Sequence, residues 1–216
     1  MIRIENVDVY GWIAAIRGAR NPMNSWNQSD TSYGTGENEV IIGPRDLDLL
    51  RRLANAGPDH GKFLRTITVT VDIVAPMVWW AEFDTYKVGT VRNSCSKMHK
   101  IHVKDFTNDD FSHEGIDQVP LAKSTFNKVI ATCERLRMAY NKTRNRKYWR
   151  ALIELLPEGY NMRATVHLNY AVLRAMYHAR KNHKLGEWRK FCAWIETLPH
   201  AELITGGDVD VRPESD

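Results

Sequence analysis

Apolar and polar residues alternate over residues 67–73, where the chain runs Ile-Thr-Val-Thr-Val-Asp-Ile. A period of two carried by β-branched side chains is typical of a half-buried strand, and we expect Pro76 to end it. Residues 3–17 predict a short strand or strand pair followed by a helix or turn. The stretch 18–36 is rich in Asn, Ser, Gly and Thr and predicts a long loop.

Most of the remaining chain carries apolar residues at helical spacing. Leucines within residues 47–53 predict a helix that begins near Pro44 and ends at Gly57-Pro58. Residues 77–86 also show a helical period. Their aromatic residues, expected to pack inward and not to stack on nucleic-acid bases, are Trp79, Trp80, Phe83 and Tyr86. Further helices are predicted at about 121–142, 145–156, 163–183 and 185–197, with loops at 89–100 and 105–120.

Together these elements predict an α+β fold, with a small antiparallel or mixed sheet packed against a helical bundle. We expect one domain over residues 1–205 and a disordered acidic tail over 206–216. The 216 residues are 43% apolar and 26% charged with a mean hydropathy of −0.44, as in soluble globular chains. Apolar runs are too short to cross a bilayer and the first residues are not a signal segment, so we expect a cytoplasmic protein without a membrane partner.

The cysteines and the charge narrow the function classes. Cys95, Cys133 and Cys192 show no CxxC spacing, so we expect reduced thiols and neither a disulfide framework nor a zinc module. A net charge of +4 favours anionic partners but is too small to establish nucleic-acid binding. The clustered basic residues are Arg135, Arg137, Lys142, Arg144, Arg146, Lys147 and Arg150. We interpret them as a solvated helix face and loop; nucleotide phosphates and a polynucleotide are the less favoured alternatives.

The spacing of a few residues near the C-terminus indicates a ligand site. Leu156-Pro157 is followed after eleven intervening residues by Asn169, and Arg180 comes further along the same predicted helix. An arginine at a fixed distance from an asparagine on a rigid element can hold a planar, anionic or polarised ligand. The structural alternative is that Arg180 pairs with a carboxylate and that Asn169 faces a neighbouring backbone from a helix interior.

These residues resemble the C-terminal motif of the flavin-dependent thymidylate synthases, which move a one-carbon unit to C5 of dUMP with a flavin as hydride carrier. In that family an asparagine at this distance from Leu-Pro contacts flavin, and a later arginine touches the uracil ring. The resemblance places these roles on Asn169 and Arg180, and the next family His and Glu are similar to His183 and Glu187. It implies that Arg180 stabilises the anionic form of the uracil ring.

The resemblance extends upstream, where the signature of the family is altered. A family histidine near the flavin falls on His60, and a family Ala-Pro falls on Ala75-Pro76. The signature Arg-His-Arg falls on Thr85-Tyr86-Lys87, so only the third of its basic positions keeps a charge. Lysine supplies one compact charge without the planar fork of a guanidinium, which weakens the expected attraction for the flavin diphosphate.

The part of the signature that follows is altered as well. Its spaced serines and its Arg-Tyr fall on Thr90, Ser94, Cys95, Ser96 and Lys97. The glutamine before the signature becomes Glu82, and an arginine shortly before Leu-Pro becomes Ile153. Glu82 would repel a nearby anion unless it is protonated or paired. We therefore expect the fold to be shared with the family more closely than the ligand set.

The resemblance implies a divergent methyltransferase of this family, which converts dUMP to dTMP or makes a related change at C5 of a pyrimidine deoxynucleotide. FAD would be the cofactor, with NADPH and methylene-tetrahydrofolate as co-substrates, and the assembly would be a homotetramer. The implied flavin-binding residues are His60, Tyr86, Lys87 and Asn169. The implied nucleotide-binding residues are Glu82, Ser94, Cys95, Ser96 and Lys97, with Arg180 as the catalytic residue.

Two other functions are compatible with the altered signature. One is a nucleotide-binding or scaffolding protein that keeps the fold without flavin chemistry. The other is an enzyme that leaves a different one-carbon product at C5. A metal site at His178, His183 and Glu187 is not expected, because the sequence has no HExxH or paired-carboxylate pattern there.

Overall fold

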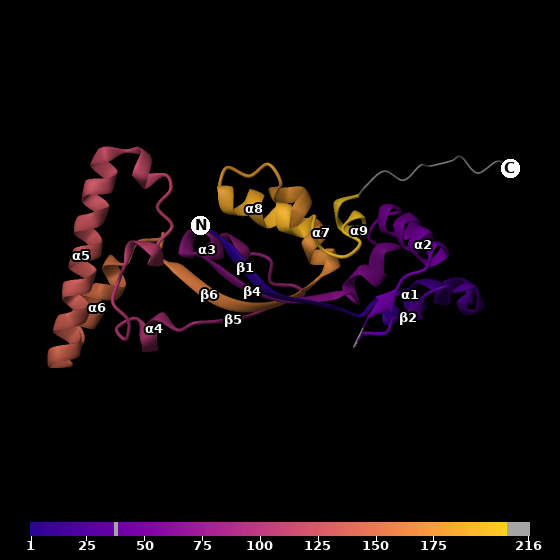
Figure 1. Cartoon of the computed structure of the whole chain (residues 1–216), viewed down its shortest axis with the longest axis horizontal. Coiled ribbons are helices and arrows are strands. Elements are labelled where there is room, and N and C mark those ends of the chain that lie inside the picture. The colour runs from indigo at the N-terminus through magenta and orange to yellow at the C-terminus, as the bar shows by residue number, and fades with distance from the viewer. Residues whose placement is uncertain (37–38, 207–216) are drawn as a thin grey trace. The chain divides into compact units, whose positions relative to one another are not determined.

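The computed structural model describes residues 1–36 and 39–206, so the predicted tail lies outside the described residues except for Gly206. The main sheet has four strands in the order β1-β4-β6-β5 (Figure 1). Their bounds are Arg3–Tyr10 for β1, Thr68–Pro76 for β4, Thr90–Ser94 for β5 and Asn161–Asn169 for β6. A separate antiparallel hairpin pairs β2 (Ser32–Tyr33) with β3 (Val40–Ile41). With the helices below, these strands confirm the α+β class.

The chain forms two compact units. The first unit consists of Met1–Glu5, Asp72–Thr85 and Arg92–Thr165. The second unit consists of Asn6–Val71, Tyr86–Val91 and the chain from Val166 onward. Each strand of the main sheet contributes residues to both units. The single domain expected over residues 1–205 stays a prediction.

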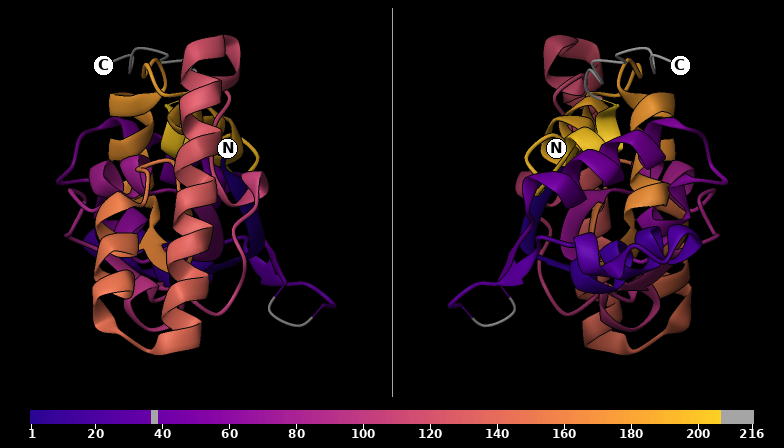
Figure 2. Two further views of the ribbon diagram at one scale, coloured as in Figure 1. Left: turned by 90° about the vertical axis from the view of Figure 1, so that its left-hand side faces the viewer. Right: turned by 90° about the vertical axis from the view of Figure 1, so that its right-hand side faces the viewer.

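The first unit contains a long helical hairpin. The helices of the first unit are α3 (Met77–Phe83), α4 (Lys97–Lys100), α5 (Pro120–Thr143) and α6 (Arg146–Leu155), with 3-10 turns at Asn108–Asp110 and Ile116–Gln118. Helices α5 and α6 lie side by side and are joined by a tight turn (Figure 2). The core around them contains Ile101, Phe111, Phe126, Ile130, Cys133, Leu152 and Leu156. The predicted helices at 121–142 and 145–156 and the inward packing of Trp79, Trp80 and Phe83 are confirmed.

The second unit contains the other helices. They are α1 (Trp12–Arg20), α2 (Pro44–Asn55), α7 (Tyr170–Arg180), α8 (Gly186–Ile195) and α9 (Glu202–Thr205), with 3-10 turns at Asn21–Met23, Trp26–Gln28 and Gly61–Arg65. Helix α2 begins at Pro44, as the sequence predicts. Tyr170 is buried, packs edge-on against Trp12 and donates its hydroxyl proton to the carbonyl oxygen of Pro199 at 2.6 Å. These contacts anchor the start of α7.

A buried ion pair joins α1 to α2 in the second unit. Arg20 Nε donates to Asp46 Oδ1 at 2.6 Å, and the two side chains are 5% and 0% exposed. Asp46 Oδ2 also accepts hydrogen bonds from Ser29 Oγ and from the backbone N–H groups of Asp30 and Thr31, at 2.7, 3.1 and 3.0 Å. Burial opposes ionisation of Asp46, but the hydrogen bonds outweigh it and lower its pKa to about 2. The network ties the predicted loop to two helices.

The predicted helix at 163–183 is wrong in its first part, where the structure has strand β6 followed by α7. Ala164, Val166 and Leu168 are buried while the residues between them are exposed, which is the period of a strand. The helical pattern of the following residues begins at Tyr170 without an intervening Gly or Pro. Because no Gly or Pro separates β6 from α7, the sequence pattern does not show where the strand ends and the helix begins.

Smaller differences concern short and exposed elements. Strand β4 continues beyond the alternating residues 67–73 and ends at Pro76, as the sequence predicts. The predicted loop 89–100 contains β5 and α4, and the predicted loop 18–36 contains 3-10 turns and β2. Strand β5 lies at an edge of the sheet and is mostly exposed, so it needs no apolar alternation. The one-turn helix α9 lies beyond the last predicted helix.

Candidate functional site

Arg180 lies between two aromatic rings in the second unit. It is the last residue of α7, and its Nε donates to the hydroxyl oxygen of Tyr86 at 2.9 Å. Its guanidinium carbon lies 4.9 Å from the centre of the Trp188 ring and 5.7 Å from that of Tyr86. Trp188 is fully buried. Stacking on a fixed indole holds a guanidinium in one orientation, which is the property required of a group that must meet a planar ligand.

The turn after α7 supports this cluster. The His183 ring lies 6.3 Å from that of Trp188, and its Nδ1 accepts the N–H of Leu185 at 3.2 Å. Arg189 Nη1 donates to the carbonyl oxygens of His183 and Lys184 at 2.6 and 3.0 Å. The His183 to Glu187 stretch therefore fixes the junction that places Trp188 beside Arg180.

Asn169 lies at the junction of a strand and a helix, where its side chain makes a hydrogen bond. It ends β6 and caps α7, because its Oδ1 accepts the backbone N–H of Val172 at 3.0 Å. Its amide nitrogen lies against Gly89, where an added Cβ would be only 2.9 Å from Asn169 Nδ2. Gly89 has a φ of +77°, a backbone conformation that favours glycine. A side chain at this position would also be too close to Asn169.

We expect Gly89→Ala to destabilise the protein more than Gly57→Ala does. Both glycines have positive φ, but a Cβ at Gly57 meets nothing within 4 Å. Each change should cost about 1 kcal/mol for the backbone, and Gly89→Ala should add the displacement of the Asn169 cap, worth about 1 kcal/mol more. Melting temperatures of the two variants measure the difference. Equal losses would show that Asn169 does not depend on the small residue at position 89.

A cavity of about 340 Å³ lies in the second unit. Its lining residues are Ala54, Asn55, Gly57, Pro58, Gly61, Leu64, Arg65, Ala171 and Arg174. Gly61 follows His60 directly, and Ala171 lies in the first turn of the helix that Asn169 caps. Neither His60 nor Asn169 lines the cavity, but residues close to each of them in the sequence do.

Two arginines of this cavity were not singled out by the sequence. Arg174 is half-buried and donates to the carbonyl oxygen of Leu203 at 2.7 Å and to Asn55 Oδ1 at 3.2 Å, both neutral acceptors. Burial lowers its pKa. Arg65 is exposed and makes no ion pair with any residue in the described ranges. Arg174 follows Asn169 by five residues, so its place on the same helix could have been read from the sequence. The position of Arg65 near Arg174 depends on the folded structure.

The implied nucleotide-binding residues lie in the first unit, around the end of β5. Ser96 Oγ accepts the N–H of His99 at 3.3 Å and caps α4, and Lys97 Nζ lies 2.7 Å from Met77 Sδ. The Cys95 N–H donates to the carbonyl oxygen of Arg163 at 2.9 Å, so it is already engaged in the sheet. Ser94 and Cys95 are exposed. Any anion held here would meet the hydroxyls and Lys97, and not the Cys95 amide.

The remaining implied residues lie on α3 and in the turn after it. Glu82 is on α3 in the first unit, and its carbonyl oxygen accepts the hydroxyl proton of Thr85 at 2.7 Å. Lys87 is exposed and follows Tyr86 in the second unit. Among the residues described, no three His, Cys, Asp or Glu side chains gather as a metal site would require, and no helix is long and apolar enough to cross a membrane.

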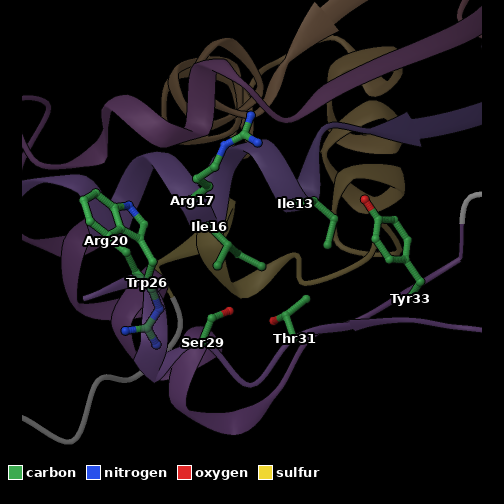
Figure 3. A pocket seen from close by; sticks show the side chains of 8 residues that line it. All are labelled: Ile13, Ile16, Arg17, Arg20, Trp26, Ser29, Thr31 and Tyr33. Atoms are coloured by element: carbon green, nitrogen blue, oxygen red, sulfur yellow. The ribbon is translucent and has the colours of Figure 1, made fainter. Parts of the chain in front are cut away.

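A second cavity, of about 300 Å³, is lined by none of the implied residues (Figure 3). Ile13 and Ile16 project from α1 toward the segment with Ser29 and Thr31. Trp26 and Tyr33 lie at its two ends. Most of its lining surface is apolar, and both Arg20 and Ser29 are bound to Asp46, so few polar groups are left to fix the orientation of a ligand.

Comparisons with protein-family models and with curated protein sequences give no match. Comparison of folds does give matches. Two crystal structures of the flavin-dependent thymidylate synthase ThyX from Helicobacter pylori, both with FAD and dUMP, match with a TM-score of 0.68. One is 16% identical over 94% of this chain and 99% of that one; the other is 14% identical over 95% and 98%. The chain therefore has the fold of a flavin-dependent thymidylate synthase.

Proposed function

We propose that this protein is a divergent flavin-dependent thymidylate synthase-like enzyme, which transfers a one-carbon unit to C5 of a pyrimidine deoxynucleotide. The reaction would be dUMP to dTMP or a related modification. The observation that carries the proposal is the Arg180 guanidinium, held against Trp188 and Tyr86 on the helix where the family resemblance requires it. The matching fold, solved with FAD and dUMP in a ThyX protein, supports the same ligand classes.

Arg180 and Tyr86 would act on the pyrimidine ring. A fixed positive charge beside the ring stabilises the anionic form that has higher electron density at C5, and it does so where charge develops. Tyr86 accepts a hydrogen bond from Arg180, so its own hydroxyl proton can be donated to a ring carbonyl. No protein nucleophile is required for this role.

The cavity lined by Arg65 and Arg174 would hold the phosphates of a flavin dinucleotide. A dinucleotide phosphate requires cations, and Arg65 and Arg174 supply two guanidinium groups that the altered signature lacks. Asn169, His60, Tyr86 and Lys87 would contact the rest of the cofactor. Bound FAD would supply hydride transfer, with NADPH as reductant and methylene-tetrahydrofolate as carbon donor. The protein residues bind and orient these groups and exclude water.

The serine hydroxyls at the end of β5 would hold the nucleotide phosphate. Ser94 and Ser96 would donate hydrogen bonds, Lys97 would supply the charge, and Cys95 and Glu82 would flank the nucleotide. Phosphate recognition by hydroxyls and one lysine is weaker than recognition by guanidinium forks. We therefore expect a lower affinity for dUMP than a site with arginines would give. A cytoplasmic homotetramer is the proposed assembly.

Binding of FAD tests the proposal directly. Protein incubated with excess FAD and dialysed should retain the visible absorbance of a flavin. FAD at 100 times its Kd should stabilise the fold by about 2.7 kcal/mol, which raises the melting temperature by roughly 5–10 °C. Arg65→Ala should weaken FAD binding about 10-fold, because it removes a charge-assisted hydrogen bond. Arg52→Ala, an exposed arginine on α2, is the matched control. Absence of both colour and stabilisation would refute the flavin proposal.

Replacement of Arg-His-Arg by Thr85-Tyr86-Lys87 supports a second candidate. It is a nucleotide-binding or scaffolding protein that kept this fold and lost the flavin. In that case dUMP should raise the melting temperature and FAD should not. If both bind, mass analysis of dUMP and dCMP incubated with methylene-tetrahydrofolate, FAD and NADPH will identify the product formed at C5.

A further inference from the structure

The turn that joins α5 to α6 concentrates positive charge. Residues 139–150, which we call the basic tip, contain five cations and no carboxylate. The cations are Lys142, Arg144, Arg146, Lys147 and Arg150, and all are exposed. The net charge of +4 for the whole chain conceals this local excess, because acidic residues elsewhere offset it.

Most of these cations have no counter-charge. Arg150 pairs with Glu154 one turn further along α6, at 2.5 Å. The other four, within residues 142–147, form no ion pair in the part of the chain that the structure describes. Two of them rest on aromatic rings: Arg144 lies 5.7 Å from the Tyr140 ring and Lys147 lies 4.9 Å from the Tyr148 ring. Such contacts orient the cations without neutralising them.

The turn is built to hold these charges in place. Arg144 closes α5 in the left-handed conformation with a φ of 53°, and its N–H donates to the Tyr140 carbonyl oxygen at 2.7 Å. Asn145 then caps α6, with its Oδ1 accepting the N–H of Lys147 at 3.1 Å. The hairpin is anchored by the apolar core of the first unit, and the tip projects from it (Figure 2). Four like charges are therefore presented on a rigid support.

Neighbouring like charges repel each other, and a bound polyanion would relieve this repulsion. The choice and spacing of residues favour nucleic acid. Arginine forks bind phosphate with two aligned hydrogen bonds, and closely spaced cations match the closely spaced phosphates of a nucleic-acid backbone. An anionic membrane surface fits less well, because surface-bound helices insert large apolar side chains. The nearest exposed ones, Met138 and Leu155, lie outside the tip.

We propose that the basic tip binds the phosphate backbone of a polynucleotide, without sequence preference. Four phosphate contacts predict that the logarithm of the binding constant falls with the logarithm of salt concentration with a slope of about −3 to −4. This proposal is independent of the proposed enzymatic function. The experiment below contains no flavin or mononucleotide, so failure of one proposal leaves the other standing.

Fluorescence anisotropy of labelled oligo-dT and of a labelled DNA duplex, titrated with the full chain over a range of salt concentrations, tests the proposal. Wild-type protein should bind with the slope given above. The fourfold variant Lys142→Ala, Arg144→Gly, Arg146→Ala and Lys147→Ala should bind at least about 100-fold more weakly at low salt and lose most of the slope. Glycine at position 144 suits the left-handed backbone, so the melting temperature should stay within a few degrees.

A second fourfold variant separates local charge from net charge. Replacing Arg17, Arg52, Lys128 and Lys190 by alanine removes the same number of exposed cations away from the tip. This control should bind DNA within a few-fold of wild type. Equal losses in the two variants, or no DNA binding by wild type at low salt, would overturn the proposal. So would binding to phosphatidylserine vesicles or poly-glutamate that exceeds binding to DNA.

Discussion

Replacing Arg180 by lysine is expected to lower kcat/KM for dUMP by about 100-fold or more while the melting temperature falls by only a few degrees. Lysine keeps the charge but loses the plane that stacks on Trp188 and the Nε–H that reaches Tyr86 at 2.9 Å. Steady-state kinetics with dUMP, together with thermal unfolding, measure both quantities. The affinity for dUMP, measured by calorimetry, should fall less than kcat if the charge acts mainly on the developing anion.

The matched control for Arg180→Lys is Lys181→Ala. Lys181 is the next residue, is exposed and lies over the Tyr177 ring at 5.8 Å. Its removal should leave turnover within a factor of about two, because surface contacts of this kind contribute little. If Arg180→Lys retained full turnover, or if it unfolded the protein while turnover per folded molecule stayed intact, the residue would be structural and the proposed chemistry would need another group.

Replacing Asp46 by alanine is expected to destabilise the protein by about 3–5 kcal/mol, which lowers the melting temperature by roughly 10 °C. The change leaves the Arg20 guanidinium buried without its carboxylate and removes the acceptor for Ser29 and two backbone N–H groups. Asp48→Ala is the control on the same helix. Asp48 also pairs with an arginine, Arg52, but both are exposed, so this loss should stay below about 1 kcal/mol.

Because Asp46 is ionised in the fold, we expect the protein to lose stability at acidic pH. Asp46 has a pKa of about 2 in the fold against an ordinary value of 3.8. A lowered pKa in the native state means that the stabilisation is complete above about pH 4 and is lost as the pH falls toward 2. The difference corresponds to about 2 kcal/mol. Urea unfolding between pH 2 and pH 5 should show this loss in the wild type and much less of it in Asp46→Ala.

Local patterns predicted those parts of the fold whose burial has a clear period. Helices α2, α5 and α6 and the strand β4 follow from the spacing of their apolar residues. Strand β6 alternates as well, but the absence of a breaker before Tyr170 joined it to the following helix. Strand β5 could not be found in this way, because an exposed edge strand carries no apolar signal.

The candidate site was likewise predicted only in part from the sequence. The spacing of Asn169 and Arg180 from Leu-Pro pointed to α7, and both residues occupy structured positions at its two ends. Their partners come from distant segments: Tyr86 is 94 positions from Arg180, and Gly89 meets Asn169. Arg65 and Arg174 are far apart in the sequence and line the same cavity only in the folded structure. Contacts of this kind depend on tertiary structure, which single-sequence patterns do not contain.

The capping role of Asn169 would give the proposed site a chemical selectivity. Its oxygen already accepts the Val172 N–H, so a donor on a ligand would have to share that oxygen with the start of α7, and loss of the cap would cost about 1 kcal/mol. The amide nitrogen can only donate. In the proposed site, a ring that turns a carbonyl oxygen toward this residue would therefore be favoured over a ring that turns an amino group toward it. Discrimination between keto and amino heterocycles would begin at the first turn of a helix.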